Sequence, residues 1–195
     1  CRGIKPLDRG FRLWGEAFTV AYGPLDESRG DQTVGDFIDE VPEGAVVVIA
    51  NGGRRDCTVW GDILTLTARG RGVAGTIIDG MARDSRASIE LGYPVFALGS
   101  YMRTGKGRAA IQAIQEPVEI GGALVSPGDF VLGSADGVVI IPRPLRREVL
   151  RLANRIEEVE TDIRSAVLRG VPLAEARGRF GYHVVAAGRE NAHGL

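Results

Sequence analysis

The sequence predicts an α/β fold in a single domain: a layered βαβ sheet, then a β-rich half, then a long C-terminal helix. Strand-like apolar runs alternate with helix-like segments between residues 34 and 98, which indicates βαβ units and a partly parallel sheet. After residue 118, short β-branched runs are separated by Gly-Gly, Pro-Gly-Asp and Asp-Gly turns, which is typical of hairpins or a small barrel.

Apolar patterns define the elements of the first half. Residues 17–22 read as a strand, and the apolar spacing over residues 34–41 predicts a helix. Residues 45–50 are continuously apolar, so we expect a strand buried on both faces, which Asn51-Gly52-Gly53 ends as a turn. Four further elements are expected: a helix over about 60–71, a strand over 73–78, a helix over 85–91 and a strand over 94–98.

The second half is read in the same way. Short strands are expected at residues 118–120, 123–125, 130–132 and 138–141. A helix is expected over about 145–168, because its apolar residues keep a helical stripe until Gly170 and Pro172 end it. The tail after Gly181 carries little signal. Since no linker rich in Pro or Ser interrupts the chain, we expect one domain over residues 1–195, with its core at about 12–182.

Composition excludes several classes of partner. The 195 residues carry a net charge of −1, so no overall field draws the chain to nucleic acid or to an anionic membrane. The apolar runs are too short to span a bilayer, and no charged-then-apolar leader is recognisable. Cys1 and Cys57 form no CxxC pair, which favours a reduced protein, and we expect a cytoplasmic location.

The scarcity of Lys and His excludes several mechanisms. Lys5 and Lys106 are the only lysines, and neither is suited to form a Schiff base. His183 and His193 have no paired spacing, so a His-ligated zinc or iron site and a Ser-His-Asp triad are not expected. Residues 104–107 resemble a phosphate loop but lack the full Walker spacing, so we expect a mobile loop over the site instead.

Carboxylates and arginines remain as the candidates for chemistry. Asp62 precedes the Arg83-Asp84 pair with twenty residues between them, and that pair follows an apolar strand and an Asp-Gly turn. The same pattern of strand, turn and Arg-Asp occurs earlier, at Arg55-Asp56. Neighbouring parallel strands would bring both segments to the carboxyl edge of the sheet, where α/β proteins bind ligands.

These residue types suit a hard divalent cation, Mg²⁺ or Mn²⁺, with oxygen ligands and several waters. Asp84 is the candidate direct ligand, Asp62 could reach the metal through water, and Arg83 would meet an oxyanion or carboxylate. The backbone amides of Gly61, Asp62, Ile63 and Leu64 would donate to a substrate carboxylate at a helix start.

A plainer interpretation of the same residues stays open. Asp84 could serve only as the N-cap of the helix that starts at Ser85, and an Arg-Asp pair near a strand end is most often a surface ion pair. Asp62 is equally well explained as a first-turn acid that the helix dipole favours.

The chain resembles the family that contains 4-hydroxy-4-methyl-2-oxoglutarate aldolase and the regulator of ribonuclease activity A, over about residues 12–182. The spacing of Asp62 from Arg83-Asp84 is the specific signal, since within the family it resembles the mark of the aldolases. The other similar passages are Gly61-Asp62-Ile63-Leu64, Ala74-Gly75-Thr76-Ile77-Ile78-Asp79-Gly80, Ser126-Pro127-Gly128-Asp129 and Asp136-Gly137-Val138-Val139-Ile140-Ile141-Pro142.

The resemblance implies a metal-dependent (class II) pyruvate aldolase acting on 4-hydroxy-2-oxo acids, with oxaloacetate decarboxylation as a side activity. It implies that Asp84 binds the metal, Arg83 contacts the pyruvyl oxygen, Asp62 orients a metal-bound water, and the backbone of residues 61–64 holds the carboxylate. It also implies a β-rich half like a swivelling phosphohistidine domain, and trimers or hexamers with sites near subunit interfaces. A Glu of the neighbouring subunit would approach the site, and Glu160 is the best match; a solvated helix face is the alternative.

The sequence also departs from the family pattern. Residues 101–114 lack the usual Gly-Pro-rich stretch, and Arg54-Arg55-Asp56 is added to the first loop. An extra arginine near the entrance could bind another carboxylate or a sugar-acid hydroxyl. The alternatives are a non-catalytic protein that binds and inhibits a ribonuclease, and a lyase acting on a sugar-derived oxo acid.

Overall fold

A computed structural model describes residues 1–25 and 35–188 of the chain. They belong to two compact units, Cys1–Arg143 and Pro144–Leu195. The expectation of one domain over the whole chain stays a prediction. Among the described residues, no helix is long and apolar enough to cross a membrane.

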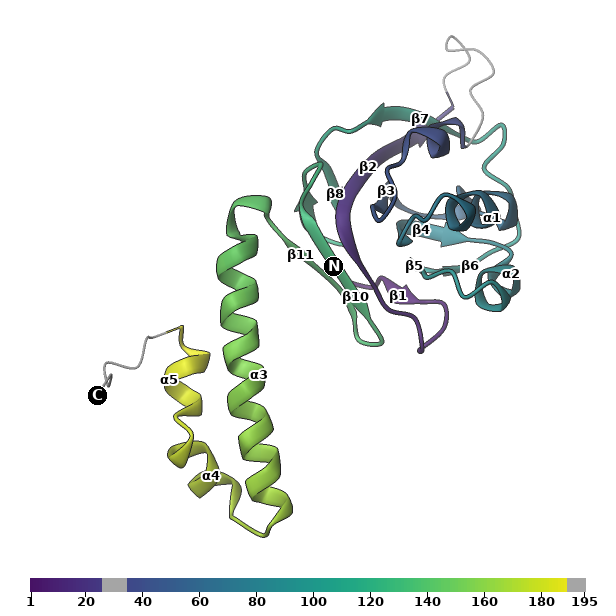
Figure 1. Ribbon diagram of the computed structural model, residues 1–195. Helices are drawn as coiled ribbons and strands as arrows, with labels where there is room; N and C mark the ends of the chain where they lie inside the picture. The colour runs from purple at the N-terminus through teal and green to yellow at the C-terminus, as the bar shows by residue number, and fades with distance from the viewer. Residues whose placement is uncertain (26–34, 189–195) are drawn as a thin grey trace. The chain divides into compact units, whose positions relative to one another are not determined.

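The first unit is built on a mixed sheet with the strand order β1-β5-β4-β3-β2-β10-β11, in which β6 also pairs with β4 and β7 with β2 (Figure 1). The pairs β2–β3, β3–β4 and β4–β5 are parallel, whereas β10 is antiparallel to both β2 and β11. The strands are β1 (Lys5–Pro6), β2 (Leu13–Pro24), β3 (Val46–Thr58), β4 (Gly75–Ala82), β5 (Val95–Ala97), β6 (Gly99–Ser100), β7 (Ala109–Ile114), β10 (Phe130–Ser134) and β11 (Gly137–Ile141), with β8 (Val118–Ile120) and β9 (Ala123–Val125) as a separate hairpin.

The sheet is nearly closed, because its two ends approach each other. The N-terminal amine of Cys1 donates to the carbonyl of Val138 in β11 at 2.9 Å, and Lys5 Nζ in β1 donates to the carbonyl of Asp136 at 2.5 Å. The hydrophobic core inside the curl contains side chains from the β8–β9 hairpin, β10 and β11. The β-rich half is therefore confirmed as short strands and hairpins.

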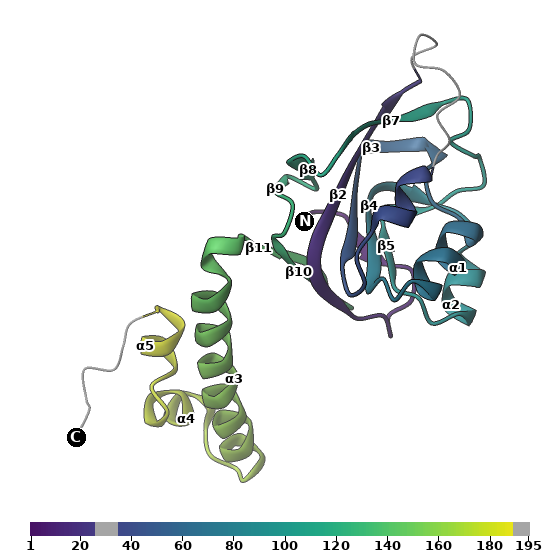
Figure 2. The same cartoon turned by 45° about the horizontal axis from the view of Figure 1, so that its top comes forward.

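Helices α1 (Asp62–Gly70) and α2 (Ser85–Glu90) lie together on one face of the sheet, as both views show (Figures 1 and 2). With the 3-10 helix η2 (Asp36–Glu40), α1 covers a second core that includes Phe37, Trp60 and Ala68. The βαβ order predicted between residues 45 and 98 is confirmed. The helix expected over 34–41 is a 3-10 helix instead, and Val34 lies outside the described residues.

The turn predicted at Asn51-Gly52-Gly53 is wrong, because β3 continues through it to Thr58. Gly52 and Gly53 have φ values of 59° and 67°, which lets the strand bulge without ending. Asp79 of β4 holds the bulge, since its Oδ2 accepts the Gly53 N–H at 3.1 Å. Burial raises the pKa of the Asp79 carboxyl, against the effect of the backbone hydrogen bonds it accepts.

The second unit contains the predicted long helix, α3 (Arg146–Leu168), which follows the 3-10 turn η3 (Arg143–Leu145). Two short helices, α4 (Leu173–Arg179) and α5 (Tyr182–Ala186), follow where the sequence carried little signal. The small core of this unit contains Ile163, Ala166 and Ala176.

Candidate functional site

The parallel pairing of β3 and β4 brings the start of α1 beside the end of β4. Thr58 at the end of β3 pairs with Met81, and the Arg83 N–H donates to the carbonyl of Trp60 at 3.0 Å. Residues 59–62 and 82–84 therefore run side by side at the carboxyl edge of the sheet. The predicted meeting of Asp62 with the Arg83-Asp84 pair is what the structure shows.

Asp84 has an unusual backbone conformation. Its φ of 55° and ψ of 37° lie in the left-handed region, which costs a residue other than Gly about 1 kcal/mol or more. Asp84 occupies the N-cap position of α2, as the plainer interpretation expects, but its side chain makes no capping hydrogen bond. The carboxylate instead turns to α1, where Oδ2 accepts the Asp62 N–H at 3.2 Å. Strain combined with a carboxylate aimed at a neighbouring loop points to a role other than capping.

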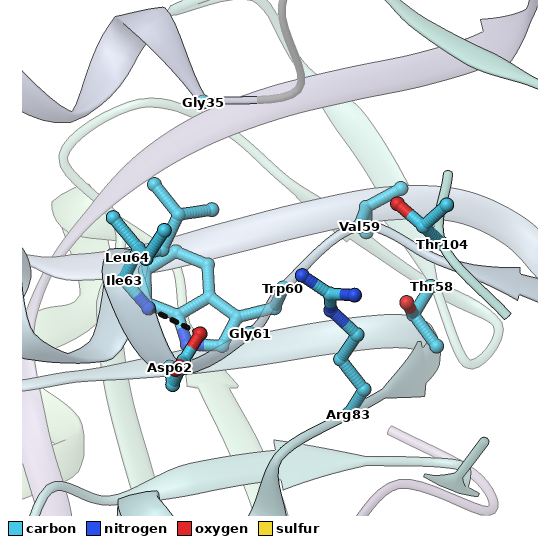
Figure 3. Close-up of a pocket in the computed structure, with 10 residues that line it drawn as sticks. All are labelled: Gly35, Thr58, Val59, Trp60, Gly61, Asp62, Ile63, Leu64, Arg83 and Thr104. Carbon is cyan, nitrogen blue, oxygen red and sulfur yellow. Dashed lines mark hydrogen bonds between the residues drawn. The ribbon is translucent and has the colours of Figure 1, made fainter. Parts of the chain in front are cut away.

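Arg83 and Asp84 form an ion pair in which Arg83 Nε lies 3.3 Å from Asp84 Oδ2. Both side chains are 38% exposed, so solvent and a ligand can reach them. Within the described residues, the terminal guanidinium nitrogens of Arg83 make no further hydrogen bond. Figure 3 shows the guanidinium directed toward Thr58 and Val59, so its free edge faces the pocket.

The start of α1 offers backbone donors, but two of them are already engaged. The Asp62 N–H donates to Asp84. The Ile63 N–H donates to Asp62 Oδ1 at 2.8 Å, the bond that is dashed in Figure 3. Leu64 is the third residue of α1, and its N–H has no partner within the helix. A substrate carboxylate at this helix start would therefore have to displace the Asp62 side chain to reach the amide of Ile63.

Gly61 makes the close approach of these groups possible. A Cβ at this position would lie 2.8 Å from Asp84 Oδ2 and 2.9 Å from Arg83 Nε, closer than real Cβ atoms come to other atoms. The φ of Gly61 is −149°, which any residue adopts, so space and not backbone freedom requires glycine here.

A pocket of about 180 Å³ is lined by Gly61, Asp62 and Arg83 but not by Asp84, and its size suits a small acid better than a drug-sized molecule. Buried Trp60, one of its lining residues, donates from Nε1 to Thr65 Oγ1 at 2.9 Å and stacks on Tyr93. Thr58 and Thr104, which also line the pocket, could not be selected from the sequence because neither side chain carries a charge. The lining residues are Gly35, Thr58, Val59, Trp60, Gly61, Asp62, Ile63, Leu64, Arg83 and Thr104 (Figure 3).

The earlier Arg-Asp pattern has a different environment. It lies in the bulged second half of β3, where Arg54 binds both carboxylate oxygens of Asp56 at 3.0 Å. That hydrogen bond is the main cause of the lowered pKa of Asp56. Arg54 also donates to the carbonyl of Arg108 at 3.0 Å, so this segment ties β3 to the loop over residues 101–108.

Glu160 lies in the other compact unit, on α3, where Oε2 accepts a hydrogen bond from Arg164 at 3.4 Å. Its predicted approach to the site of a neighbouring subunit stays a prediction.

The donor set fits a hard divalent cation that keeps most of its waters. Among the described residues, no group of three or more His, Cys, Asp or Glu side chains could enclose a metal ion. The hydrogen bond from Asp62 and the ion pair with Arg83 both involve Oδ2 of Asp84, and neither involves its other carboxylate oxygen, Oδ1. The exposed residue Asp62 lies next to Asp84. One direct carboxylate with water and substrate oxygens is a coordination that Mg²⁺ accepts.

Comparison with known proteins identifies the family to which the chain is similar. The model of the family described as "RraA-like: Aldolase/RraA" matches residues 1–140. Protein DlpA of Legionella pneumophila is 38% identical over 181 residues, which are 92% of this chain but 29% of DlpA. A Halalkalibacterium halodurans protein named "Putative 4-hydroxy-4-methyl-2-oxoglutarate aldolase" is 36% identical over 154 residues, 78% of this chain and 70% of that protein.

Solved structures show the same fold. An uncharacterised protein of Pseudomonas syringae is 40% identical and superposes with a TM-score of 0.84 over 90% of this chain and 83% of its own. Streptomyces coelicolor RraAS2, described as an unusual member of the RNase ES inhibitor RraA family, is 30% identical with a TM-score of 0.74, over 82% of this chain and 80% of its own.

Proposed function

Because the chain belongs to the RraA-like family, which is described as containing aldolases and RraA proteins, we propose that it is a divalent-metal-dependent lyase. Its substrates are 4-hydroxy-2-oxo acids, which it cleaves to pyruvate and a second oxo compound, and it also decarboxylates oxaloacetate. The observation that carries this proposal is the Arg83–Asp84 pair, held at the start of α1 with the guanidinium facing the pocket.

The roles of the side chains follow from the cleavage. When the bond between C3 and C4 breaks, its electron pair moves toward the 2-oxo oxygen, where the free edge of Arg83 would stabilise the developing negative charge. Asp84 would hold Mg²⁺ or Mn²⁺, which supplies a further positive charge at that oxygen when bound. Asp62, reaching a water from the first turn of α1, would take up the proton of the C4 hydroxyl through that water, and the same water would return a proton to C3 of the enolate to give pyruvate.

Binding of the substrate carboxylate is the part of the proposal that requires movement. The Ile63 N–H is occupied by Asp62 in this state, so rotation of the Asp62 side chain would both free the amide and bring the carboxylate to its water. Rotation of the Asp62 side chain would thus couple binding of the substrate carboxylate to the placement of Asp62 as the general base.

The proposal extends to assembly. We expect trimers or hexamers in which Glu160 of a neighbouring subunit lies at the site. We also expect the β-rich half to resemble a swivelling phosphohistidine domain. Because both cysteines are free, we expect a cytoplasmic location.

Pyruvate release tests the function directly. We expect wild type to release pyruvate from oxaloacetate and from 4-hydroxy-4-methyl-2-oxoglutarate only when Mg²⁺ or Mn²⁺ is present, and Asp84→Ala to lose this activity. A wild type that turns over neither substrate with either metal would refute the lyase. Full activity in Asp84→Ala would refute the assigned ligand.

A non-catalytic role is the alternative, and the similarity to RraAS2 favours testing it. A protein of this kind would slow cleavage of RNA by a ribonuclease in stoichiometric amounts, and Asp84→Ala would inhibit as well as wild type. Sugar-derived 4-hydroxy-2-oxo acids belong in the same pyruvate assay, since the proposed chemistry does not depend on the second product.

A further inference from the structure

Two threonines line the pocket on the far side of Arg83 from α1. Thr58 is the last residue of β3, and Thr104 lies in the loop after β6 and forms an isolated parallel bridge with Thr58. Figure 3 shows the Arg83 guanidinium between these two side chains and the start of α1. A ligand that extends from the start of α1 across Arg83 would therefore reach the two threonines next.

The two threonines differ in whether the hydroxyl hydrogen is already in use. Thr58 is buried, and its Oγ1 donates to the carbonyl of Arg103 at 3.1 Å. Thr104 is exposed, and its Oγ1 accepts the N–H of Lys106 at 3.2 Å but donates to no group within residues 1–25 and 35–188. A hydroxyl group that accepts one hydrogen bond still has its own hydrogen to donate. Thr104 therefore offers a donor to a ligand in the pocket, whereas Thr58 does not.

Among the lining side chains that the structure describes, Arg83 and Thr104 are the two with a donor left for a ligand. The indole N–H of Trp60 and the hydroxyl of Thr58 already donate within the protein. The other lining residues are glycines, apolar residues and the acceptor Asp62. Since the proposed function assigns Arg83 to the 2-oxo oxygen, Thr104 remains for a second oxygen of the substrate.

The loop that carries Thr104 is fixed against β3. The backbone N–H of Thr58 donates to the carbonyl of Arg103 at 2.9 Å, and a Cβ on Gly105 would lie 2.5 Å from the carbonyl oxygen of Thr58. Nη1 of Arg108 donates to the carbonyl of Thr104 at 3.3 Å. The Thr104 hydroxyl is thus positioned before a ligand binds, which is the condition under which a hydrogen-bond donor stabilises a transition state most effectively.

We propose that Thr104 is a catalytic residue whose hydroxyl donates a hydrogen bond to the C4 oxygen of the substrate. This inference rests on the proposed function, which places the substrate carboxylate at the start of α1 and the 2-oxo oxygen at Arg83. Carbons C3 and C4 then extend from Arg83 toward the wall that Thr58 and Thr104 form.

The hydrogen bond acts while the C4 oxygen carries negative charge. The C4 hydroxyl gives its proton to the water held by Asp62, and the electron pair left on the oxygen forms the new carbonyl bond. The C3–C4 bond breaks at the same time, and its electron pair moves into the enolate at Arg83. Thr104 keeps its own proton throughout. Because a hydrogen bond to a charged oxygen is stronger than one to a neutral oxygen, its loss should slow cleavage by about tenfold or more.

Pyruvate alone separates the role of Thr104 from that of the rest of the site. Pyruvate has no C4, but exchange of its methyl hydrogens with D₂O requires the same enolate at Arg83. Two rates are measured in the presence of Mg²⁺: pyruvate release from 4-hydroxy-4-methyl-2-oxoglutarate, and loss of the pyruvate methyl signal in proton NMR spectra. Thr104→Val, which has nearly the same shape but no hydroxyl, should lower kcat/KM for cleavage about tenfold and leave the exchange at the wild-type rate.

Two further variants test the hydroxyl itself. Thr104→Ser keeps both the donor and the acceptor for the Lys106 N–H, so its cleavage should be close to that of wild type. Thr67→Val is the matched control on α1, where the hydroxyl donates to the carbonyl of Ile63 and Thr67 does not line the pocket. Thr67→Val should change neither rate.

The outcomes separate Thr104 from the lyase. Cleavage by Thr104→Val at the wild-type rate, or an equal fall in cleavage and in exchange, would overturn the role of Thr104 even if wild type is a lyase. Cleavage by Thr104→Ser as slow as that by Thr104→Val would also overturn it. A wild type that neither cleaves the hydroxy-oxo acid nor exchanges the methyl hydrogens of pyruvate would instead overturn the proposed function, and the role of Thr104 with it.

Discussion

Replacing Gly61 by Ala should damage the site while leaving the fold intact. The added methyl group would meet Asp84 Oδ2 at 2.8 Å and Arg83 Nε at 2.9 Å. Both are ends of partly exposed side chains, so the pair can move away, and the backbone conformation of Gly61 suits Ala. The substitution therefore changes the position of the Arg83–Asp84 ion pair relative to the start of α1.

The size of the effect follows from the distances. Restoring an ordinary contact of 3.4 Å requires Asp84 to move by about 0.6 Å. Since a misplacement of about 1 Å costs roughly 100-fold in rate, we expect kcat/KM for pyruvate release to fall about tenfold or more. The free energy of unfolding should fall by only about 1 kcal/mol, the usual cost of Ala at an N-cap position.

Gly70→Ala, at the other end of α1, is the matched control. A Cβ there meets no atom within 4 Å, and Ala in a helix is more stable than Gly by about 0.5–1 kcal/mol, so this variant should keep full activity. The two variants are compared by pyruvate release from oxaloacetate and by urea denaturation. Wild-type activity in Gly61→Ala would show that the close packing of Gly61, Arg83 and Asp84 has no part in catalysis.

Three further predictions concern the surrounding structure. Asp79→Asn keeps an acceptor for the Gly53 N–H and removes a charge that burial disfavours, so the variant should have a higher Tm than wild type at pH 7. Because the pKa of Asp79 is raised in the folded state, wild type gains stability as the pH falls through this pKa, and the difference in Tm should shrink in acid. A difference in Tm that stays constant with pH would contradict this. Arg54→Met should release the loop over residues 101–108, so trypsin should cleave after Lys106 faster than in wild type, whereas Arg55→Met should not change the rate. Trp60→Phe removes the indole donor to Thr65 and should lower the free energy of unfolding by about 1–3 kcal/mol in urea titrations; no change would show that the buried hydrogen bond and ring volume do not matter.

The sequence predicted the elements whose apolar patterns are long or repeated. Continuous apolar runs located β3 and β4, and the helical stripe located α3 within a residue of its start. The bulge in β3 was mistaken for a turn because Asn-Gly-Gly is typical of turns, and only the partner strand, through Asp79, keeps the chain extended. Strand β7 was not among the predicted strands, because it pairs antiparallel with β2, from which it is separated by about 90 residues in the chain.

The candidate site was predicted in part. The spacing of Asp62 from Arg83-Asp84 indicated that these residues meet, and the parallel strands bring them together. The strained backbone of Asp84, the closeness of Gly61 and the occupation of the Ile63 amide by Asp62 could not be read from the sequence, because each depends on atomic distances between separate segments. Thr58 and Thr104 were missed because an uncharged strand residue carries no signal of its own.

Metal-dependent activity of Asp84→Asn tests the central claim most directly. Pyruvate release from oxaloacetate is measured across a titration of Mn²⁺, with Asp39→Asn, an exposed carboxylate paired with Arg71, as the control. We predict that Asp39→Asn follows the wild-type titration, whereas Asp84→Asn loses at least 100-fold in activity at every concentration of metal. Equal titrations for wild type and Asp84→Asn would contradict the assignment of the Arg83–Asp84 pair as the catalytic centre.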